Sequence, residues 1–486
     1  MNLSLKWPER IGTPAFFSAL NQEHQKTASL VIATVLFYMC QKAINAQTFL
    51  GDAREYWFLS SHIWDMSFPQ TIRGYFYPTI LSPIKTITEI LPALGYFPLR
   101  ICQAFIYSIT FTLILPSIFI NTFGGKCSTL RRLITPIFLV TFFPGLISYP
   151  LSDLPAFALL LTAVYLSHAS ANAKRGIAAV TLMILSGVCA YGAYNVRSIY
   201  LFSVLILIFI IPTLVLQGRS IGSKIFLTSL FIAGLAISSM PQALINKRNF
   251  DSFTPLVISN IKGSSLFAAQ LKWGIAIQRY ETRINEDRTR AFPTFYFDPE
   301  ASEILLHDKN STKEATIKWY LTLVAARPIS FLSIYAKHFV NGIDVRDYEI
   351  YTTKPSTERQ LRSVISIAIS YLGIFFLAMI FANRKNIAGE PSVSKSLWMA
   401  LFLVPVAAIL PGAIETRFFL PLHILIYAAI AFTIQIESIH ILKGKYLWIV
   451  SAMYIALVTA SVLSAESSIS SPVGSIPEKF QEIIKR

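Results

Sequence analysis

Charged residues are scarce in this chain, and their scarcity decides its class. Asp, Glu, Lys and Arg together make up 14% of the 486 residues, whereas hydrophobic residues make up 54% and aromatic residues 13%. Soluble globular domains carry about 25% charged residues. A soluble protein is therefore excluded, and the composition indicates an integral membrane protein.

Cysteines and acidic residues are also few. The 4 cysteines lie in or beside apolar stretches and form no spaced pair, which argues against a disulfide framework. Acidic residues number 26 against 42 Lys and Arg, which gives a formal net charge of +16. The basic residues are scattered over loops and form no single stripe. The excess is therefore typical of membrane topology and does not indicate a nucleic-acid partner.

Several sequence patterns are absent as well. The sequence has no Gly-rich nucleotide-phosphate loop and no His, Asp or Glu spacing that defines a dedicated metal site. It also lacks the strand-like alternation of a membrane β-barrel. These absences favour a helical membrane protein whose substrate is not a free nucleotide.

Long apolar stretches recur along most of the chain. Each is long enough to cross a hydrocarbon core of about 30 Å as a helix. We predict an all-α integral membrane protein with about 11 transmembrane helices. The predicted spans are 27–46, 101–123, 133–148, 154–170, 177–194, 199–217, 225–245, 363–383, 397–412, 418–435 and 446–465.

The spans divide the chain into regions with different compositions. Short juxtamembrane helices are expected in the first external loop, and a mainly α-helical external domain in the longest polar stretch. The predicted regions are a cytoplasmic N-terminal segment (1–26), a transmembrane core (27–245) with the first external loop (47–100), the external domain (246–362), C-terminal transmembrane helices (363–465) and an external tail (466–486).

The distribution of basic residues predicts the orientation. Short segments on one side carry groups such as Arg131-Arg132 and Lys174-Arg175, whereas the shortest turns on the other side carry only Arg197 and Arg417. Cytoplasmic loops are enriched in Lys and Arg. We therefore place the N-terminus in the cytoplasm and the C-terminus outside, in the periplasm of a bacterial inner membrane.

Isolated charges gather on the predicted outer side. A charged cluster, Gly51 to Trp57, follows the first span almost without a spacer. Charges next to hydrocarbon are costly and tend to mark substrate paths or internal pairs. The other isolated charges of short outer turns are Asp153, Arg197, Glu415 and Arg417.

This arrangement resembles the GT-C class of polytopic glycosyltransferases, which use a polyprenyl-phosphate-linked sugar as donor. A narrower similarity, carried by the segment Lys337 to Gly342, is to prophage-type glucosyltransferases that decorate bacterial O-antigen. The motifs of the wider resemblance are Gly51-Asp52-Ala53-Arg54-Glu55-Tyr56, Ser152-Asp153-Leu154-Pro155 and Glu415-Thr416-Arg417-Phe418-Phe419-Leu420-Pro421.

The resemblance implies a role for Asp52 as the base that takes the proton of the acceptor hydroxyl, with inversion at the sugar carbon. Transfer from a lipid phosphate also needs cations beside the departing phosphate. Guanidinium groups match phosphate oxygens with two hydrogen bonds, so the arginines of the motifs are the expected contacts. The expected substrate-binding residues are Arg54, Glu55, Tyr56, Asp153, Arg197, Glu415 and Arg417.

Several of these residues have a second interpretation. Glu55 is equally suited to pairing with a nearby arginine, and Asp153 to capping the helix that starts at Leu154. Glu415 and Arg417 are consistent with a simple interfacial ion pair. Some members of the class use a divalent cation such as Mg²⁺ or Mn²⁺, and Asp52 and Asp153 are the residues that would hold it with the donor phosphate.

The chain as a whole also has alternative functions. A transporter or flippase for lipid-linked saccharides, or a polymerase acting on them, would also be basic, polytopic and rich in outer arginines. Transporters tend to show repeated halves and charges in mid-span. This sequence shows no internal repeat, and its charges gather at one face. We therefore expect a transferase whose partners are a polyprenyl-phosphate sugar, a glycan acceptor and the lipid bilayer.

Overall fold

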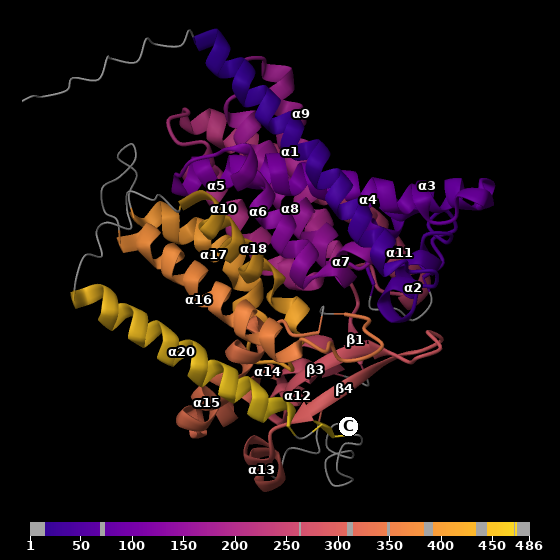
Figure 1. Ribbon diagram of the computed structural model, residues 1–486. Coiled ribbons are helices and arrows are strands. Elements are labelled where there is room, and N and C mark those ends of the chain that lie inside the picture. The colour runs from indigo at the N-terminus through magenta and orange to yellow at the C-terminus, as the bar shows by residue number, and fades with distance from the viewer. Residues whose placement is uncertain are drawn as a thin grey trace, which may run out of the picture.

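A computed structural model describes residues 15–68, 73–261, 264–308, 314–347, 350–382, 392–433, 445–470 and 472–473. Part of the predicted N-terminal segment (1–26) and most of the predicted tail (466–486) lie outside these residues. In the described part, helices dominate and strands are short and few (Figure 1).

Nine helices of the described residues are long and apolar enough to cross a membrane. The chain is therefore a multi-pass, mainly helical membrane protein. These helices cover Gln22–Ile44, Phe97–Phe123, Asp153–Ala171, Gly176–Val196, Ser198–Val215, Ile221–Phe250, Arg359–Phe381, Thr416–Thr433 and Trp448–Ile469. The elements that form them are α1 (Ala15–Ile44), α4 (Phe97–Ile109), α5 (Leu115–Phe123), α8 (Asp153–Ala171), α9 (Gly176–Val196), α10 (Leu201–Ile210), α11 (Ile221–Phe250), α16 (Arg359–Ala382), α18 (Leu420–Thr433) and α20 (Lys445–Ile469).

The other two predicted spans correspond to shorter helices. The span predicted at 133–148 divides into α6 (Thr129–Phe142) and α7 (Pro144–Ser148). Proline lacks a backbone N–H and disfavours a helical residue before it, which explains the break before Pro144. At 1.5 Å per residue, α6 spans about 21 Å, which is short of the hydrocarbon core. The span predicted at 397–412 lies in α17 (Ser392–Ile409).

The loop at 47–100, which the sequence analysis predicts to be external, contains the short helices expected there. They are α2 (Gly51–Leu59) and α3 (Phe76–Ile90), and α3 extends away from the bundle on one side (Figure 1). Two residues of α3, Tyr77 and Leu81, are buried against the bundle, while Ile90 is exposed. The loop is therefore a folded part of the protein that attaches α2 to the helix ends.

The 246–362 region combines helices with two small antiparallel sheets at one end of the bundle (Figure 1). One sheet pairs β1 (Asn260–Ile261) with β2 (Ser264–Ser265). The antiparallel hairpin of β3 (Ile277–Ile284) and β4 (Ala291–Phe297) is extended by β5 (Pro472–Val473) from the C-terminal tail. The sequence analysis predicted the helices of this domain but not its sheets. The helices are α12 (Leu266–Ala276), α13 (Pro299–His307), α14 (Ile317–Ala326) and α15 (Pro328–Ile343).

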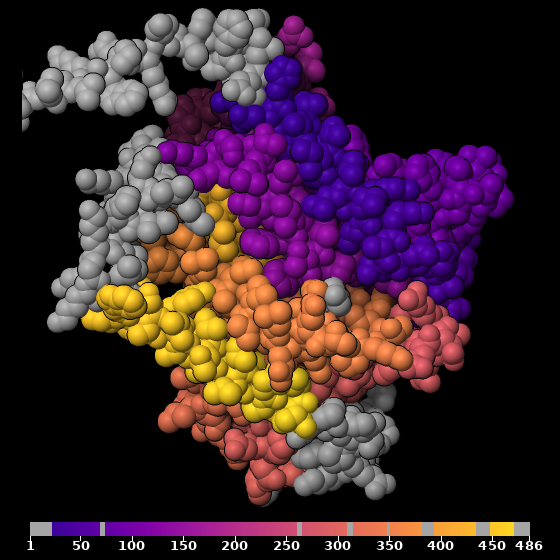
Figure 2. Space-filling model, in the orientation of Figure 1, coloured from indigo at the N-terminus to yellow at the C-terminus, as the bar shows by residue number. Residues whose placement is uncertain are grey.

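The two halves of the chain pack against each other. In Figure 2 the N-terminal half, coloured indigo to purple, adjoins the orange and yellow C-terminal helices on the same face. Within the bundle α8 packs along α9, and α18 contacts both α6 and α16. Residues far apart in the sequence therefore meet at the ends of these helices.

The structure separates the predicted inner and outer ends of the helices. Asp153 begins α8 at the charged cluster, and Ala171 ends the same helix, where its carbonyl oxygen accepts a hydrogen bond from Arg219 at 2.6 Å. The basic segments predicted to be cytoplasmic thus lie at the opposite end of α8 from the acidic turn.

A labelling experiment tests the predicted orientation. In a protein whose four free cysteines are replaced, we expect Asp287→Cys to react with a membrane-impermeant maleimide from the outside. Lys126→Cys and Arg175→Cys should react only after permeabilisation, because basic short loops remain in the cytoplasm. All three positions are exposed, so access to them depends on the side of the membrane. Labelling of Asp287→Cys from the cytoplasmic side alone would reverse the orientation.

Candidate active site

Asp52 lies in the first turn of α2, where the chain turns sharply after α1. Gly51 has φ +48°, a left-handed conformation that glycine adopts without strain. The Tyr351 hydroxyl donates a hydrogen bond to the Leu50 carbonyl at 2.7 Å and accepts one from the Ala53 N–H at 3.4 Å. The backbone on both sides of Asp52 is thereby held by one side chain from a distant part of the chain.

Two arginines flank the Asp52 carboxylate. A terminal nitrogen of Arg73 lies 2.5 Å from one oxygen, and one of Arg417 lies 3.3 Å from the other. The Asp52 side chain keeps 31% of its surface exposed. Burial acts to raise its pKa, but the positive charges of Arg73, Arg417 and Arg197 outweigh burial and hold the pKa below its usual value. The carboxylate is therefore ionised and accessible.

Arg417 connects three carboxylates. It lies 2.7 Å from Glu415, 3.3 Å from Asp52 and 3.8 Å from Asp153. Arg197 forms a second ion pair with Asp153. The predicted turn charges thus meet in one cluster, in which the Asp153 carboxylate is 2% exposed and the Arg417 side chain 8%.

The carboxylates of Asp153 and Glu415 are buried below the arginines. Ser152 precedes α8 as its N-cap and makes no side-chain cap bond, and the Asp153 carboxylate pairs with arginines. Glu415 accepts a hydrogen bond from the Thr282 hydroxyl at 2.7 Å. Burial raises the pKa of Glu415, and the nearby charge of Arg417 offsets part of that effect. These two acids orient the arginines, which leaves Asp52 as the exposed carboxylate of the group.

The cluster opens into a cavity of about 330 Å³. Its lining includes polar and charged residues, among them Asp52, Tyr56, Arg73, Asn195, Arg197 and Arg417. It also includes apolar residues, mainly from α12 and α17, among them Ile199, Leu266, Phe267, Leu271, Ala408 and Ile409. The Phe418 ring lies 4.8 Å from the guanidinium carbon of Arg197 and 5.5 Å from that of Arg417. The cavity thus presents cations beside an apolar wall.

The structure distributes the predicted site residues unequally. Asp52, Tyr56, Arg197 and Arg417 line the cavity, and Asp153 and Glu415 contact its arginines. Glu55 is largely exposed and pairs with Arg73 at 3.2 Å, as its second interpretation proposed. Arg54 is exposed on α2 and does not line the cavity.

Some residues of the cavity escaped the sequence analysis. Arg73 lies in a long loop with several other charges, so it had no signal of its own. Tyr280 lines the cavity from β3, and Thr282 of the same strand holds Glu415. Tyr280 and Thr282 could have been identified only if the β3–β4 hairpin had been predicted from the sequence. Asn195 joins α9 to its neighbours, because it accepts a hydrogen bond from the Phe76 N–H at 2.8 Å and donates one to Gln242 at 2.8 Å.

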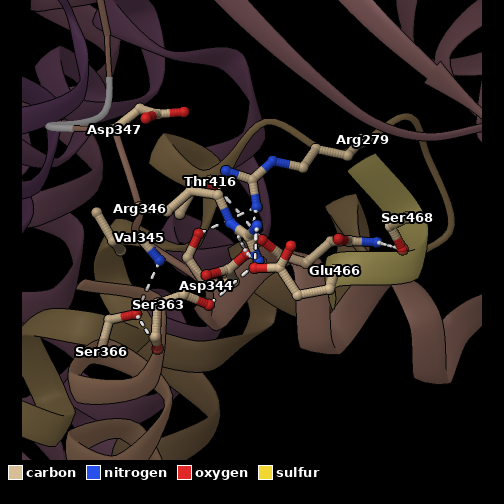
Figure 3. Close-up of polar contacts among 12 residues, drawn as sticks. Arg279, Asp344, Val345, Arg346, Asp347, Ser363, Ser366, Thr416, Glu466 and Ser468 are labelled. Atoms are coloured by element: carbon tan, nitrogen blue, oxygen red, sulfur yellow. Dashed lines mark hydrogen bonds and ion pairs between the residues drawn. The ribbon is translucent and has the colours of Figure 1, made fainter. Parts of the chain in front are cut away.

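The opposite face of β3 contacts a buried ion network (Figure 3). Arg279 lies 2.8 Å from Asp344, and Arg346 lies 2.5 Å from Asp344 and 3.0 Å from Glu466 of α20. Along β3, Glu281 also pairs with Arg359 of α16 at 3.1 Å. Successive side chains of a strand point to opposite faces. The strand that faces the cavity through Tyr280 and Thr282 is therefore attached to the C-terminal helices by its other side.

The carboxylates do not fit a shared metal ion well. Asp52 and Asp153 are the predicted pair, but Arg417 contacts both of them. A cation placed between them would meet the positive charge of Arg417, and that of Arg197 at Asp153. The described residues contain no group of three or more His, Cys, Asp or Glu that could hold a metal ion.

Together, the fold and the cavity define a multi-pass membrane protein with an arginine–carboxylate site at one end of its helices. No family model, curated protein or solved structure matches the chain. Its function must therefore be argued from the geometry of the site.

The hydrogen bonds of Tyr351 predict an effect on Asp52. In Tyr351→Phe we expect the first turn of α2 to loosen and the carboxylate to lose its fixed position between Arg73 and Arg417. The pKa of Asp52 should rise, because those arginines lower it in the wild-type protein. The acid limb of the pH–rate profile should then shift to higher pH, with a loss of turnover of roughly tenfold.

Tyr149→Phe is the matched control for this variant. The Tyr149 ring packs edge-on against Tyr351 with their centroids 4.8 Å apart, but Tyr149 makes neither of the backbone bonds around Asp52. It should therefore keep the wild-type acid limb. If the pH–rate profiles of both variants matched that of the wild-type protein, the Tyr351 hydroxyl would have no role in positioning Asp52, and the ring would contribute packing alone.

Proposed function

We propose that the protein is an inverting glycosyltransferase that moves a sugar from a polyprenyl phosphate to a glycan or lipid-linked glycan on the periplasmic side of a bacterial inner membrane. One observation carries the proposal. An accessible carboxylate and the two arginines that flank it line a cavity that apolar residues of α12 and α17 also line. A lipid phosphate has the same two parts, a charged group and an apolar chain.

The arginines are suited to the donor phosphate. Arg197 and Arg417 both lie close to the Phe418 ring, and both line the cavity. Each guanidinium offers several N–H donors in a planar fork that matches phosphate oxygens. Buried acids hold both side chains before any ligand binds. The donor would thus meet cations already in place, which is the main requirement for stabilising a departing phosphate.

Asp52 is suited to activate the acceptor. Its carboxylate removes the proton from an acceptor hydroxyl as the oxygen attacks the anomeric carbon of the donor sugar. The new bond between acceptor oxygen and sugar carbon forms as the bond between that carbon and the phosphate oxygen breaks. The electron pair of the broken bond leaves on the phosphate, beside Arg197 and Arg417. Attack opposite the leaving group inverts the configuration at the sugar carbon.

The chemistry of the site identifies the donor and the acceptor only as classes of compound. Glucose as the sugar and O-antigen as the acceptor are the specific choices that the sequence resemblance implies. The test is to incubate the purified full-length protein in liposomes with a panel of polyprenyl-phosphate sugars and lipid-linked glycans. A new glycosidic bond in the product supports the proposal. Movement of the lipid-linked saccharide across the bilayer without bond formation would instead identify a transporter.

A further inference from the structure

A second cavity, of about 270 Å³, is lined in part by Tyr351, the residue whose hydroxyl contacts the backbone around Asp52. The ends of two helices form its apolar part, through Ala43 and Ile44 of α1 and Pro144 and Gly145 of α7. Its polar part is formed by Tyr149, Arg288, Tyr351, Thr352, Thr353 and Lys354. The cavity therefore lies between the helix ends and the external domain.

The charge of this cavity is of one sign. Arg288 and Lys354 are cationic, and none of the described residues that line the cavity is acidic. Lys354 has one acidic partner, Glu286, at 3.0 Å, but both side chains are more than 70% exposed, so solvent screens this pair. The hydroxyl groups of Thr352 and Thr353 add hydrogen-bond donors. Such a lining is complementary to a phosphate.

Arg288 is fixed in position by the hairpin turn. Its backbone is left-handed (φ +52°), its N–H donates to the Asn285 carbonyl at 2.9 Å, and its own carbonyl accepts from the Thr48 hydroxyl at 3.4 Å. Both Arg288 and the buried Tyr149 line the cavity. The turn thus presents a cation over the space between α1 and the external domain.

A lipid chain has a path to this cavity. Val35 and Met39 of α1 are 56% and 59% exposed, and Ala43, which lines the cavity, is exposed as well. Residues four apart lie on nearly the same face of a helix. A chain lying along this face of α1 would bring its phosphate to Arg288.

We infer that this second cavity binds the phosphate of a polyprenyl-linked acceptor, with Arg288 and Lys354 as its cations and the exposed face of α1 beside its chain. This inference rests on the proposed function, because it presupposes a glycan acceptor and specifies that a polyprenyl phosphate carries it. Tyr351 links this cavity to the candidate active site, because it lines the cavity and its hydroxyl holds the backbone around Asp52. An acceptor anchored here would start next to the turn that carries the proposed base.

Lipid binding to the purified full-length protein tests the inference without any activity assay. Native mass spectrometry in detergent, with polyprenyl phosphate as the probe, should show two bound molecules per protein. Arg288→Gln should retain one, with about tenfold or greater weakening at the lost site, as expected for removal of a charged hydrogen-bond donor. Arg290→Gln is the matched control and should retain two, because Arg290 lies on the same turn but does not line the cavity.

The other site is tested separately. Arg288→Gln should still bind one polyprenyl phosphate, at the candidate active site. Arg417→Ala should lose that molecule and keep the one in the second cavity. If Arg417→Ala removed none while Arg288→Gln still removed one, the proposed donor site would fail and the second cavity would stand. Two molecules bound to Arg288→Gln with wild-type affinity would overturn the inference. Equal, Arg288-dependent binding of phosphatidylglycerol would overturn the assignment to a polyprenyl carrier and identify a phospholipid headgroup site.

Discussion

Asp52→Asn is expected to leave an inserted protein that binds the lipid donor and has lost nearly all transfer. Asparagine keeps the size of the side chain and its hydrogen-bonding capacity but cannot take the proton of a sugar hydroxyl. A positioned general base contributes roughly 10²–10⁴ in rate. The measurement is turnover and donor binding on the same preparation, because only the turnover should fall.

Glu55→Gln is the matched control for this variant. Glu55 lies on the same helix and pairs with the same Arg73, but it is exposed and does not line the cavity. Its loss should change turnover by about threefold at most, as expected for a surface ion pair. Substantial turnover by Asp52→Asn, or an equal loss in both variants, would remove Asp52 from the mechanism.

Arg417→Ala is expected to have the second largest effect, because this arginine contacts three carboxylates and lines the cavity. Removing it takes away a phosphate contact and leaves Glu415 and Asp153 with less positive charge in a buried setting. Breaking a buried ion pair costs about 3–5 kcal/mol. We therefore expect lower thermal stability together with donor use reduced by about 100-fold or more.

Arg417→Lys separates these two effects. Lysine keeps the positive charge near the buried acids but offers a point charge in place of a fork. Stability should largely return, whereas the KM for the donor should stay high. Arg54→Ala is the negative control and should keep wild-type donor use. The sequence predicts a phosphate contact at Arg54, but the structure places this residue outside the cavity. Wild-type donor use by Arg417→Lys would show that charge alone matters at this position.

The positive charges around Asp52 have a consequence for the order of binding. They lower its pKa, which makes the carboxylate a weak base. A donor phosphate beside Arg197 and Arg417 would offset part of that positive charge. The proposed base would then gain strength only once the donor is present, which limits wasteful reaction of an acceptor held alone.

The sequence predicted the membrane helices well because their signal is local. A run of apolar residues must be helical in lipid wherever it occurs, since no other partner exists for its backbone groups. The same reasoning placed Asp52, Asp153, Arg197 and Arg417 on one side of the membrane, where the structure joins them. Their pairing was not predictable, because it depends on how helices far apart in sequence pack.

The residues that the sequence analysis missed depend on tertiary contacts. Arg73 becomes notable only when its loop folds beside α2, and Tyr351 only when residues near 350 reach the Leu50 carbonyl. The β3–β4 hairpin was hidden because β3 alternates charged residues with Tyr280 and Thr282. In a membrane protein this pattern resembles a polar loop. The structure shows instead a strand that is buried on both faces.

Because β3 is buried on both faces, the protein can tolerate few insertions or deletions within this strand. A shift of one residue along β3 would turn every side chain to the opposite face. Arg279 and Glu281 would then enter the cavity, while Tyr280 and Thr282 would face the ion network with Asp344 and Arg359. Single-residue insertions or deletions within 279–284 should therefore be eliminated in a random indel library. The exposed turn at 286–290 is the part of the hairpin in which such changes are compatible with folding, but they would displace Arg288 from the second cavity.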